Sequence, residues 1–356
     1  MTQPKVVSGP HVHSIFNVPR TMLMVMVALL PATGFGLYQF GWPAVFLFCV
    51  TVLSAWGFEV LSLWIAGRPV LRLASDGSAI LTGWIVAMTL PPWAPWWVGL
   101  LGAFVAIVIG KQLFGGLGQN LFNPAMVARA MLLIALPVQM TTWVAPLGMA
   151  AHPGFMASLG ITFGGHVPVD AVSSASVLGH LQSGLDAGTP MATLLAEIGP
   201  VEGLFYGHTA GSLGEISAAL LLAGGIVLIL MRIITPVIPL AVLGALFAWA
   251  ALARLIDPAH FPPATLHLSS GAAMMAAFFI ATDYVTSPTT PMGRAIYGVG
   301  IGTLIFVIRS WGAFPEGVAF SVLLMNACTP LIDTYVRPRI FGRTRSGKPL
   351  EIGERR

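Results

Sequence analysis

Long apolar tracts without a single charged side chain dominate this chain. Four tracts contain no Asp, Glu, Lys or Arg, namely 21–58, 77–110, 233–253 and 258–282. A helix needs about 20 apolar residues to cross the hydrocarbon core of a bilayer, so these tracts predict membrane-spanning helices. The hydropathy pattern predicts ten spans, at 21–39, 42–65, 77–92, 96–110, 121–137, 214–231, 236–253, 269–285, 295–311 and 317–335.

One long polar stretch, 138–212, separates the first five predicted spans from the last five. No Lys or Arg occurs in 130–231, whereas Arg68 and Lys111 follow the second and fourth spans and a basic tail occupies 337–356. Because positively charged short loops tend to stay in the cytoplasm, we expect both termini inside and the 138–212 loop outside. Five spans on either side of an exported loop place the two halves in opposite orientations.

The sequence therefore predicts an all-α polytopic membrane protein with about ten transmembrane helices in two inverted five-helix halves. The predicted divisions are a first half at 1–137, an exported loop at 138–212, a second half at 213–336 and a basic cytoplasmic tail at 337–356. Short tracts end at prolines in both halves, in DGSAILTGWIVAMTLPP and SSGAAMMAAFFIATDYVTSP, which predicts that some helices are discontinuous.

Composition indicates that lipid is the main solvent of the chain. Of the 356 residues, 56% are hydrophobic and 8% are charged, and the mean hydropathy is +0.85, unlike soluble globular domains. The net charge of +4 is concentrated in the tail, which favours cytoplasmic anchoring over a nucleic-acid partner. Cys49 and Cys328 lie in apolar tracts without CxxC spacing, so we expect two buried thiols and neither a disulfide nor an iron–sulfur site.

Four polar segments have roles that the residues alone leave open. DAVSSAS, 170–176, is typical of a turn or a helix cap. GSLGEISA, 211–218, predicts a helix N-cap with an acid in the first turn, or glycines that admit a planar ring close to backbone N–H groups. ATDYVTSPTTPMGR, 281–294, is either a cytoplasmic loop or a cofactor pocket. In GGLGQNLFNPA, Asn120 and Asn123 either cap the fifth span or line a pocket.

Glu59 and Arg129 are charged residues within apolar tracts. An unpaired charge near the bilayer centre costs at least about 2.5 to 3.5 kcal/mol, so both side chains should face protein or water. The sequence makes them candidates for an ion path or for structural pairs.

Six segments occur in a fixed order along nearly the whole chain: SGPHVHSIFNVPRTML, DGSAILTGWIVAMTLPPWAP, FGGLGQNLFNPAMVARAML, GSLGEISA, ATDYVTSPTTPMGRAIYG and FPEGVAFSVLLMNACTPLID. In this combination they resemble the RnfD family, which is related to the NqrB subunit of the sodium-pumping NADH:quinone oxidoreductase.

The resemblance implies that a hydroxyl residue carries FMN through a phosphoester bond made by a dedicated flavin transferase. The family motif has the form D-x-x-S/T-x-A-S/T, which Asp170, Ser173 and Ala175 match, and Ser176 then occupies the acceptor position. The family more often has Thr followed by Pro-Leu, whereas Ser176 is followed by Val-Leu. Because Ser offers the same oxygen nucleophile, Ser176 remains the first candidate, and Thr193 in a similar downstream segment is the second.

The resemblance also implies two further sets of flavin contacts. The first set surrounds the attached flavin and comprises Gly211, Gly214, Glu215 and Ser217. A second, non-covalent flavin such as riboflavin is implied near Asp283, Thr286 and Arg294. No residue is assigned a catalytic or metal-binding role.

By resemblance, the protein is a multi-pass component of a bacterial inner-membrane complex that also contains subunits A, B, C, E and G. Such a complex passes electrons between reduced ferredoxin and NAD while it moves Na+ or H+, and this component relays electrons and is not active alone. No GxGxxG in a βαβ setting occurs, so NAD should bind another subunit. Two alternatives remain, an NqrB-like subunit and a small-solute channel or transporter without attached flavin.

Overall fold

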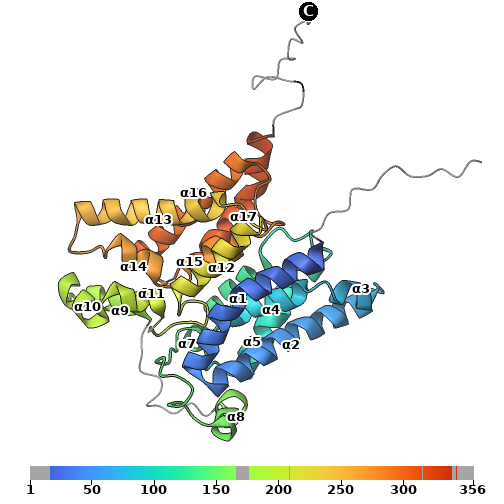
Figure 1. Ribbon diagram of the computed structural model, residues 1–356, viewed down its shortest axis with the longest axis horizontal. Coiled ribbons are helices and arrows are strands. Elements are labelled where there is room, and N and C mark those ends of the chain that lie inside the picture. Colours follow the sequence, from blue (N-terminus) through green and yellow to red (C-terminus); the bar gives the residue numbers. More distant parts are fainter. Residues whose placement is uncertain (1–16, 166–175, 208, 315, 339–341, 343–356) are drawn as a thin grey trace, which may run out of the picture.

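The computed structural model describes residues 17–165, 176–207, 209–314, 316–338 and 342, and within these ranges the chain is helical without a β-strand. Figure 1 shows the helices of the first half, from α1 to α5, beside those of the second half, from α12 to α17. Within the described residues, six helices are long and apolar enough to cross a membrane. The chain is therefore an all-α polytopic membrane protein, as the hydropathy pattern predicts.

The helices follow one another in three groups. The first half contains α1 Val18–Phe40, α2 Trp42–Ile65, α3 Val70–Ala74, α4 Ser78–Thr89, α5 Trp96–Phe104 with its π-helical extension η1 Val105–Ile109, η2 Gln112–Phe114 and α6 Pro124–Ala135. The connection contains α7 Pro137–Met140, α8 Phe155–Gly164, α9 Val177–Asp186, α10 Met191–Ile198 and α11 Val201–Tyr206. The second half contains α12 Ala218–Leu230, α13 Val237–Ile256, α14 Ala264–Ser269, α15 Ala273–Met275 with its π-helical extension η4 Ala276–Ile280, α16 Pro291–Trp311 and α17 Val318–Tyr335.

Four of the ten predicted spans are short helices. The tracts 77–92, 121–137, 214–231 and 269–285 contain α4, α6, α12 and α15 with η4, respectively. Each stops short of the length that crosses a bilayer unaided, because a proline or a glycine-rich turn interrupts it. Pro91 and Pro92, for example, directly follow the C-cap of α4. The prediction that the two halves are inverted, and the divisions drawn from it, stay predictions.

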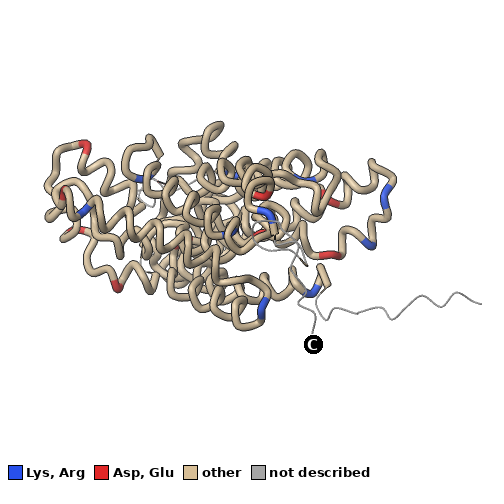
Figure 2. The backbone as a smooth tube through the Cα atoms, turned by 90° about the horizontal axis from the view of Figure 1, so that it is seen from above, with Lys and Arg blue, Asp and Glu red and all other residues tan. Residues whose placement is uncertain are grey.

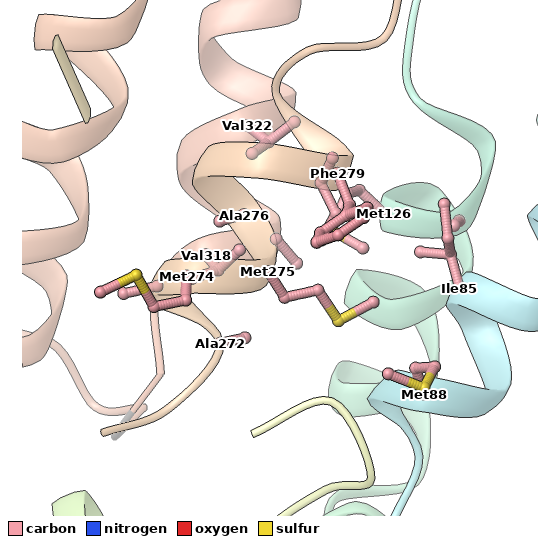
Figure 3. Close-up of a cluster of buried hydrophobic side chains, with 14 of the residues drawn as sticks. Ile85, Met88, Met126, Ala272, Met274, Met275, Ala276, Phe279, Val318 and Val322 are labelled. Atoms are coloured by element: carbon pink, nitrogen blue, oxygen red, sulfur yellow. The ribbon is translucent and has the colours of Figure 1, made fainter. Parts of the chain in front are cut away.

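The short helices meet at the centre of the molecule, between the two halves. In Figure 3, Ile85 and Met88 of α4 lie opposite Met275 and Phe279 of the α15–η4 segment, with Met126 of α6 beside them. The long helices around this centre carry exposed apolar side chains, such as Leu53 of α2 and Leu240 of α13. Figure 2 shows that charged positions are sparse along the chain. Protein thus surrounds most of α4 and of the α15–η4 segment, while the long helices present apolar surface to lipid.

Two expectations about individual segments are wrong. Cys49 of α2 and Cys328 of α17 are exposed, because they lie on helix faces where lipid, and not protein, supplies the apolar surroundings. The stretch 138–212 is not simply polar, since it contains the apolar helix α8. Phe155 of α8 packs against Trp42 and Phe46 at the start of α2, with ring centroids 5.1 Å apart in each pair.

Candidate functional site

Ser176 is the N-cap of α9, in the connection between the two halves. Its backbone is extended, and its Oγ accepts a hydrogen bond from the N–H of Gly179 at 3.2 Å. The side chain is buried. The helix cap that the residue types predict is therefore present at Ser176, while Asp170, Ser173 and Ala175 lie outside the described residues.

A small pocket beside Ser176 brings three distant segments together. Its walls include Glu215 from GSLGEISA, Ser270 and Gly271 after α14, and Glu316 from FPEGVAF. Thr193, the second candidate acceptor, is exposed in α10 and is not part of these walls. The structure therefore places Ser176, but not Thr193, against other segments that carry the family resemblance.

The glycine-rich segment before α12 packs tightly against the first half. The Gly214 N–H donates to the Met88 carbonyl at 2.7 Å, and a Cβ on Gly214 would overlap the Met275 sulfur. Ser217 caps α12, because its Oγ accepts from the Leu220 N–H at 3.3 Å. The predicted N-cap is thus confirmed, and the glycine serves close packing between helices.

Glu215 does not lie in the first turn of α12, as the capping interpretation predicts, but before the helix. It accepts a hydrogen bond from the Ser212 hydroxyl at 2.7 Å and is buried. A Cβ on Gly211 would lie 3.0 Å from Glu215 Oε2, so the backbone approaches this carboxylate closely. Glu215 is therefore oriented by its own loop and is not a helix-dipole partner.

Two buried arginines flank Glu215 and Glu316. The carboxylates of Glu215 and Glu316 interact electrostatically with each other and with Arg129, whose guanidinium donates to the Thr89 carbonyl. Glu316 accepts from Arg309 Nη2 at 3.2 Å. Two arginines and two carboxyl groups from four chain segments thus form one group, in which Arg129, Arg309 and Glu215 are buried and Glu316 is partly exposed. Their mutual contacts offset part of the cost of removing the arginine charges from solvent.

Arg309 of α16 hydrogen-bonds the end of α14. It donates from Nη1 to the His267 carbonyl at 2.7 Å and from Nη2 to the Ser270 carbonyl at 3.2 Å. Among the described residues, Arg309 Nε and both ring nitrogens of His267 are buried and have no hydrogen-bond partner. Sequence reasoning missed both residues, although an arginine within an apolar tract is a signal of the same kind as Arg129.

A second cavity, of about 100 Å³, lies at the opposite ends of the helices, between the two halves. Asp283 lines it, and its carboxylate accepts from the Val285 N–H at 3.3 Å and the Thr286 hydroxyl at 3.2 Å. Thr286 and Arg294 do not line it, and Arg294 Nε donates to the Pro288 carbonyl at 3.0 Å. Of the three residues predicted for a non-covalent flavin, Asp283 thus lines this cavity and the other two do not.

The remaining candidate residues have structural partners. Glu59 forms a buried ion pair with Lys111, whose Nζ lies 2.8 Å from Glu59 Oε1 and 2.7 Å from Ser78 Oγ. The structural-pair interpretation is confirmed for Glu59, and an ion-path role stays a prediction. Asn123 caps α6, as predicted, whereas the Asn120 side chain donates to the Phe122 carbonyl and caps no helix.

The chain is similar to membrane proteins of one family. The sequence profile of the NQR2, RnfD, RnfE family matches residues 5–342. The D subunit of an ion-translocating oxidoreductase complex of Rhodobacter capsulatus is 60% identical over 302 residues, which cover 85% of this chain and 84% of that protein. A protein of the same description from Stutzerimonas stutzeri is 53% identical, over 94% of this chain and 95% of that protein. Another from Vibrio cholerae is 40% identical, over 95% of this chain and 99% of that protein.

Proposed function

The chain belongs to the NQR2, RnfD, RnfE family, and from this premise we propose that it is the electron-relaying RnfD-type component of an Rnf complex, with FMN attached to Ser176. The complex would pass electrons between reduced ferredoxin and NAD and move Na+ or H+. The description shared by the three relatives, as D subunits of ion-translocating oxidoreductase complexes, favours the Rnf branch over the NqrB-like alternative.

The position of Ser176 is the observation that carries this proposal. It matches the acceptor position of the family motif, begins α9, and lies against Glu215 and Glu316 from two other segments of the resemblance. A phosphoester at this position would meet the free N–H groups of the first turn of α9, where the helix dipole favours a negative charge. When bound, the flavin supplies one- and two-electron transfer, and the protein sets its position and potential.

The pocket beside Ser176 also limits where the phosphate group can lie. Glu215 and Glu316 line that pocket, and no Lys or Arg is among its described lining residues, so the pocket offers a phosphodiester no cationic partner. The residues fit the group if the phosphate remains at the N-terminus of α9 and the flavin extends away from the two carboxylates.

A non-covalent flavin at the cavity lined by Asp283 is a second part of the proposal. Side chains from both halves line this cavity, including Asn123 from the first half and Phe279 from the second, and Tyr284 lines it as well. Its volume of about 100 Å³ is below the roughly 300 to 1,000 Å³ of sites that bury drug-sized ligands. Flavin entry at this position therefore requires lining side chains to move.

The proposed setting is the bacterial inner membrane, with both termini in the cytoplasm and Ser176 on the outer side. The partners would be the other subunits, A, B, C, E and G, the flavin transferase, and the lipid bilayer. The basic residues of the 337–356 tail support this orientation, and so does the lack of any Lys or Arg in 130–231.

In-gel flavin fluorescence of the denatured full-length protein tests the proposed function. The wild type, Ser176→Ala and Thr193→Ala are produced in a host that contains the flavin transferase. We expect a fluorescent band in the wild type and in Thr193→Ala and none in Ser176→Ala. A dark wild-type band would overturn the attachment and favour the channel or transporter alternative.

A further inference from the structure

We propose that α3, η2 and the last turn of α2 form a surface that binds anionic phospholipid, with Arg72 as the partner of the lipid phosphate. We call this the α3 surface, and its apolar members are Trp64, Ile65, Leu71, Leu113 and Phe114. The inference goes beyond the proposed function, because it assigns a ligand class to a part of the chain that has no role toward a flavin.

The apolar side chains of the α3 surface are open to the surroundings. Leu71 of α3 is 91% exposed and Leu113 of η2 is 73% exposed, while Trp64 and Ile65 at the end of α2 are each 71% exposed. Figure 1 shows α3 beyond the end of α2, at the edge of the molecule. Exposed apolar side chains gathered in this way mark a contact with a membrane or a partner.

The α3 surface continues the face that α2 turns toward lipid. Leu53, Gly57, Leu61 and Trp64 are exposed and follow one another every three or four residues, so they share one face of α2. Trp64 ends this row, and tryptophan is enriched where a membrane meets water. Lipid that covers α2 therefore reaches α3 without a break, which favours lipid over a protein as the occupant.

Hydrogen bonds hold the parts of the α3 surface together. Arg68, in the turn between α2 and α3, donates from Nη1 to the Gly115 carbonyl directly after η2 at 2.6 Å. The Ser75 hydroxyl donates to the Leu71 carbonyl at 2.6 Å and so closes the end of α3. The exposed leucines of α3 and η2 thus belong to one preformed surface.

The charge of the α3 surface is complementary to an anionic headgroup. Residues 60–75 contain Arg68 and Arg72 but no Asp or Glu, and residues 112–122 contain no charged side chain. Arg72 is exposed, and its guanidinium has no ion pair or hydrogen bond with the described residues. The next acid, Asp76, accepts from the Ser78 N–H at 2.8 Å and from the Ser78 hydroxyl at 2.5 Å.

These features fit a phospholipid in two ways at once. A guanidinium can donate two parallel hydrogen bonds to one phosphate, and Arg72 offers such a group beside the apolar side chain of Leu71. Leucine and phenylalanine side chains of an interfacial segment insert at the boundary between headgroups and acyl chains. A free phosphate ion would use only the arginine, whereas a phospholipid uses both parts of the surface.

Photo-crosslinking tests the apolar part of the proposal. In the full-length chain, p-benzoylphenylalanine replaces Leu71, and the assembled complex is reconstituted into vesicles of phosphatidylethanolamine and phosphatidylglycerol. After irradiation, mass spectrometry of the peptide that contains position 71 should show an attached phospholipid. Ala187, which is exposed between α9 and α10, is the matched position, and the same replacement there should give no phospholipid adduct.

The class of the attached phospholipid tests Arg72. We expect the ratio of phosphatidylglycerol to phosphatidylethanolamine in the adduct to exceed that of the vesicles. Arg72→Gln should lower this ratio about five-fold, the effect of one charge at an anionic membrane surface, and Arg72→Lys should retain most of it. Arg254→Gln is the control, because Arg254 lies in the last turn of α13 and donates to the Phe261 carbonyl at 3.2 Å.

Each result decides one part of the proposal. A crosslink from position 71 to another protein of the complex or to another segment of this chain would overturn the lipid surface, and so would a reacted position without any adduct. A phospholipid adduct whose composition ignores Arg72→Gln would overturn Arg72 as the partner of the phosphate. Neither readout involves a flavin, so this inference and the proposed flavin attachment fail separately.

Discussion

The side-chain carbonyl of Asn326, in α17, accepts the backbone N–H of Asn123 at 3.0 Å. The two residues come from opposite halves of the sequence, and Asn123 is the N-cap of α6. The same Asn326 donates from Nδ2 to the Tyr297 hydroxyl at 2.7 Å and to the Thr286 carbonyl at 3.3 Å. One buried side chain therefore satisfies polar groups of both halves in the middle of a membrane protein.

Replacing Asn326 by Leu should destabilise the folded protein. The change leaves the Asn123 N–H and the Tyr297 hydroxyl without this partner, at a cost of about 1 to 3 kcal/mol for a buried unsatisfied group. Thermal unfolding in detergent, followed by tryptophan fluorescence, should show a lower Tm. Asn120→Leu serves as the control, because Asn120 is also buried but donates to the nearby Phe122 carbonyl and not to the other half. Equal losses in both variants would mean that the link between the halves has no special weight.

The Glu59–Lys111 pair gives a prediction about buried charge. Both side chains are nearly inaccessible, at 3% and 2% exposure, and Lys111→Met would leave the Glu59 carboxylate without its cation. Removing one partner of a buried pair typically costs about 3 to 5 kcal/mol. We expect Lys111→Met to reduce folded yield and Tm, and the double variant Glu59→Gln/Lys111→Met to recover most of the loss.

The same double variant separates the two interpretations of Glu59. A structural pair predicts that ion transport by the reconstituted complex recovers together with stability. Recovery of stability without recovery of transport would instead assign Glu59 to an ion path.

Gly214 should not tolerate a side chain. Its Cβ would overlap the Met275 sulfur and lie 3.0 Å from the Met88 carbonyl oxygen, so Gly214→Ala overpacks the contact between the halves. Overpacking typically costs about 1 to 3 kcal/mol. Gly244→Ala is the matched control, since nothing lies within 4 Å of the position of its Cβ. The comparison of Tm values should show a loss in Gly214→Ala alone, and Met275→Ala should restore only part of it.

Hydropathy predicted the long helices well because these helices face lipid along most of their length. The predicted span 236–253, for example, lies almost entirely within α13, Val237–Ile256. The hydropathy pattern predicted spans that are longer than the short helices, because the apolar sequence continues past the helix end into turns that protein buries. Leu90 shows this, since it is fully buried although α4 ends at Thr89.

The candidate site was predictable only in its separate parts. Family motifs indicated Ser176 and Glu215, but the contact of Glu215 with Glu316 joins segments that are far apart in the chain. No local pattern reports such a pairing. His267 gave no signal, because a single histidine in an apolar segment has no characteristic spacing, and only the folded chain shows that its carbonyl accepts from Arg309.

Membrane topology provides the last prediction, which concerns the side on which Ser176 lies. In a background in which Cys49 and Cys328 are Ser, Ala187→Cys places a thiol at an exposed position between α9 and α10. Gln119→Cys places one in the exposed turn before α6. The charge pattern predicts opposite sides, so a membrane-impermeant maleimide should label the first variant in cells with a permeable outer membrane and the second only after the inner membrane is opened. Labelling of both thiols before that step would contradict the exported loop, and with it the proposed access of an outer-side flavin transferase to Ser176.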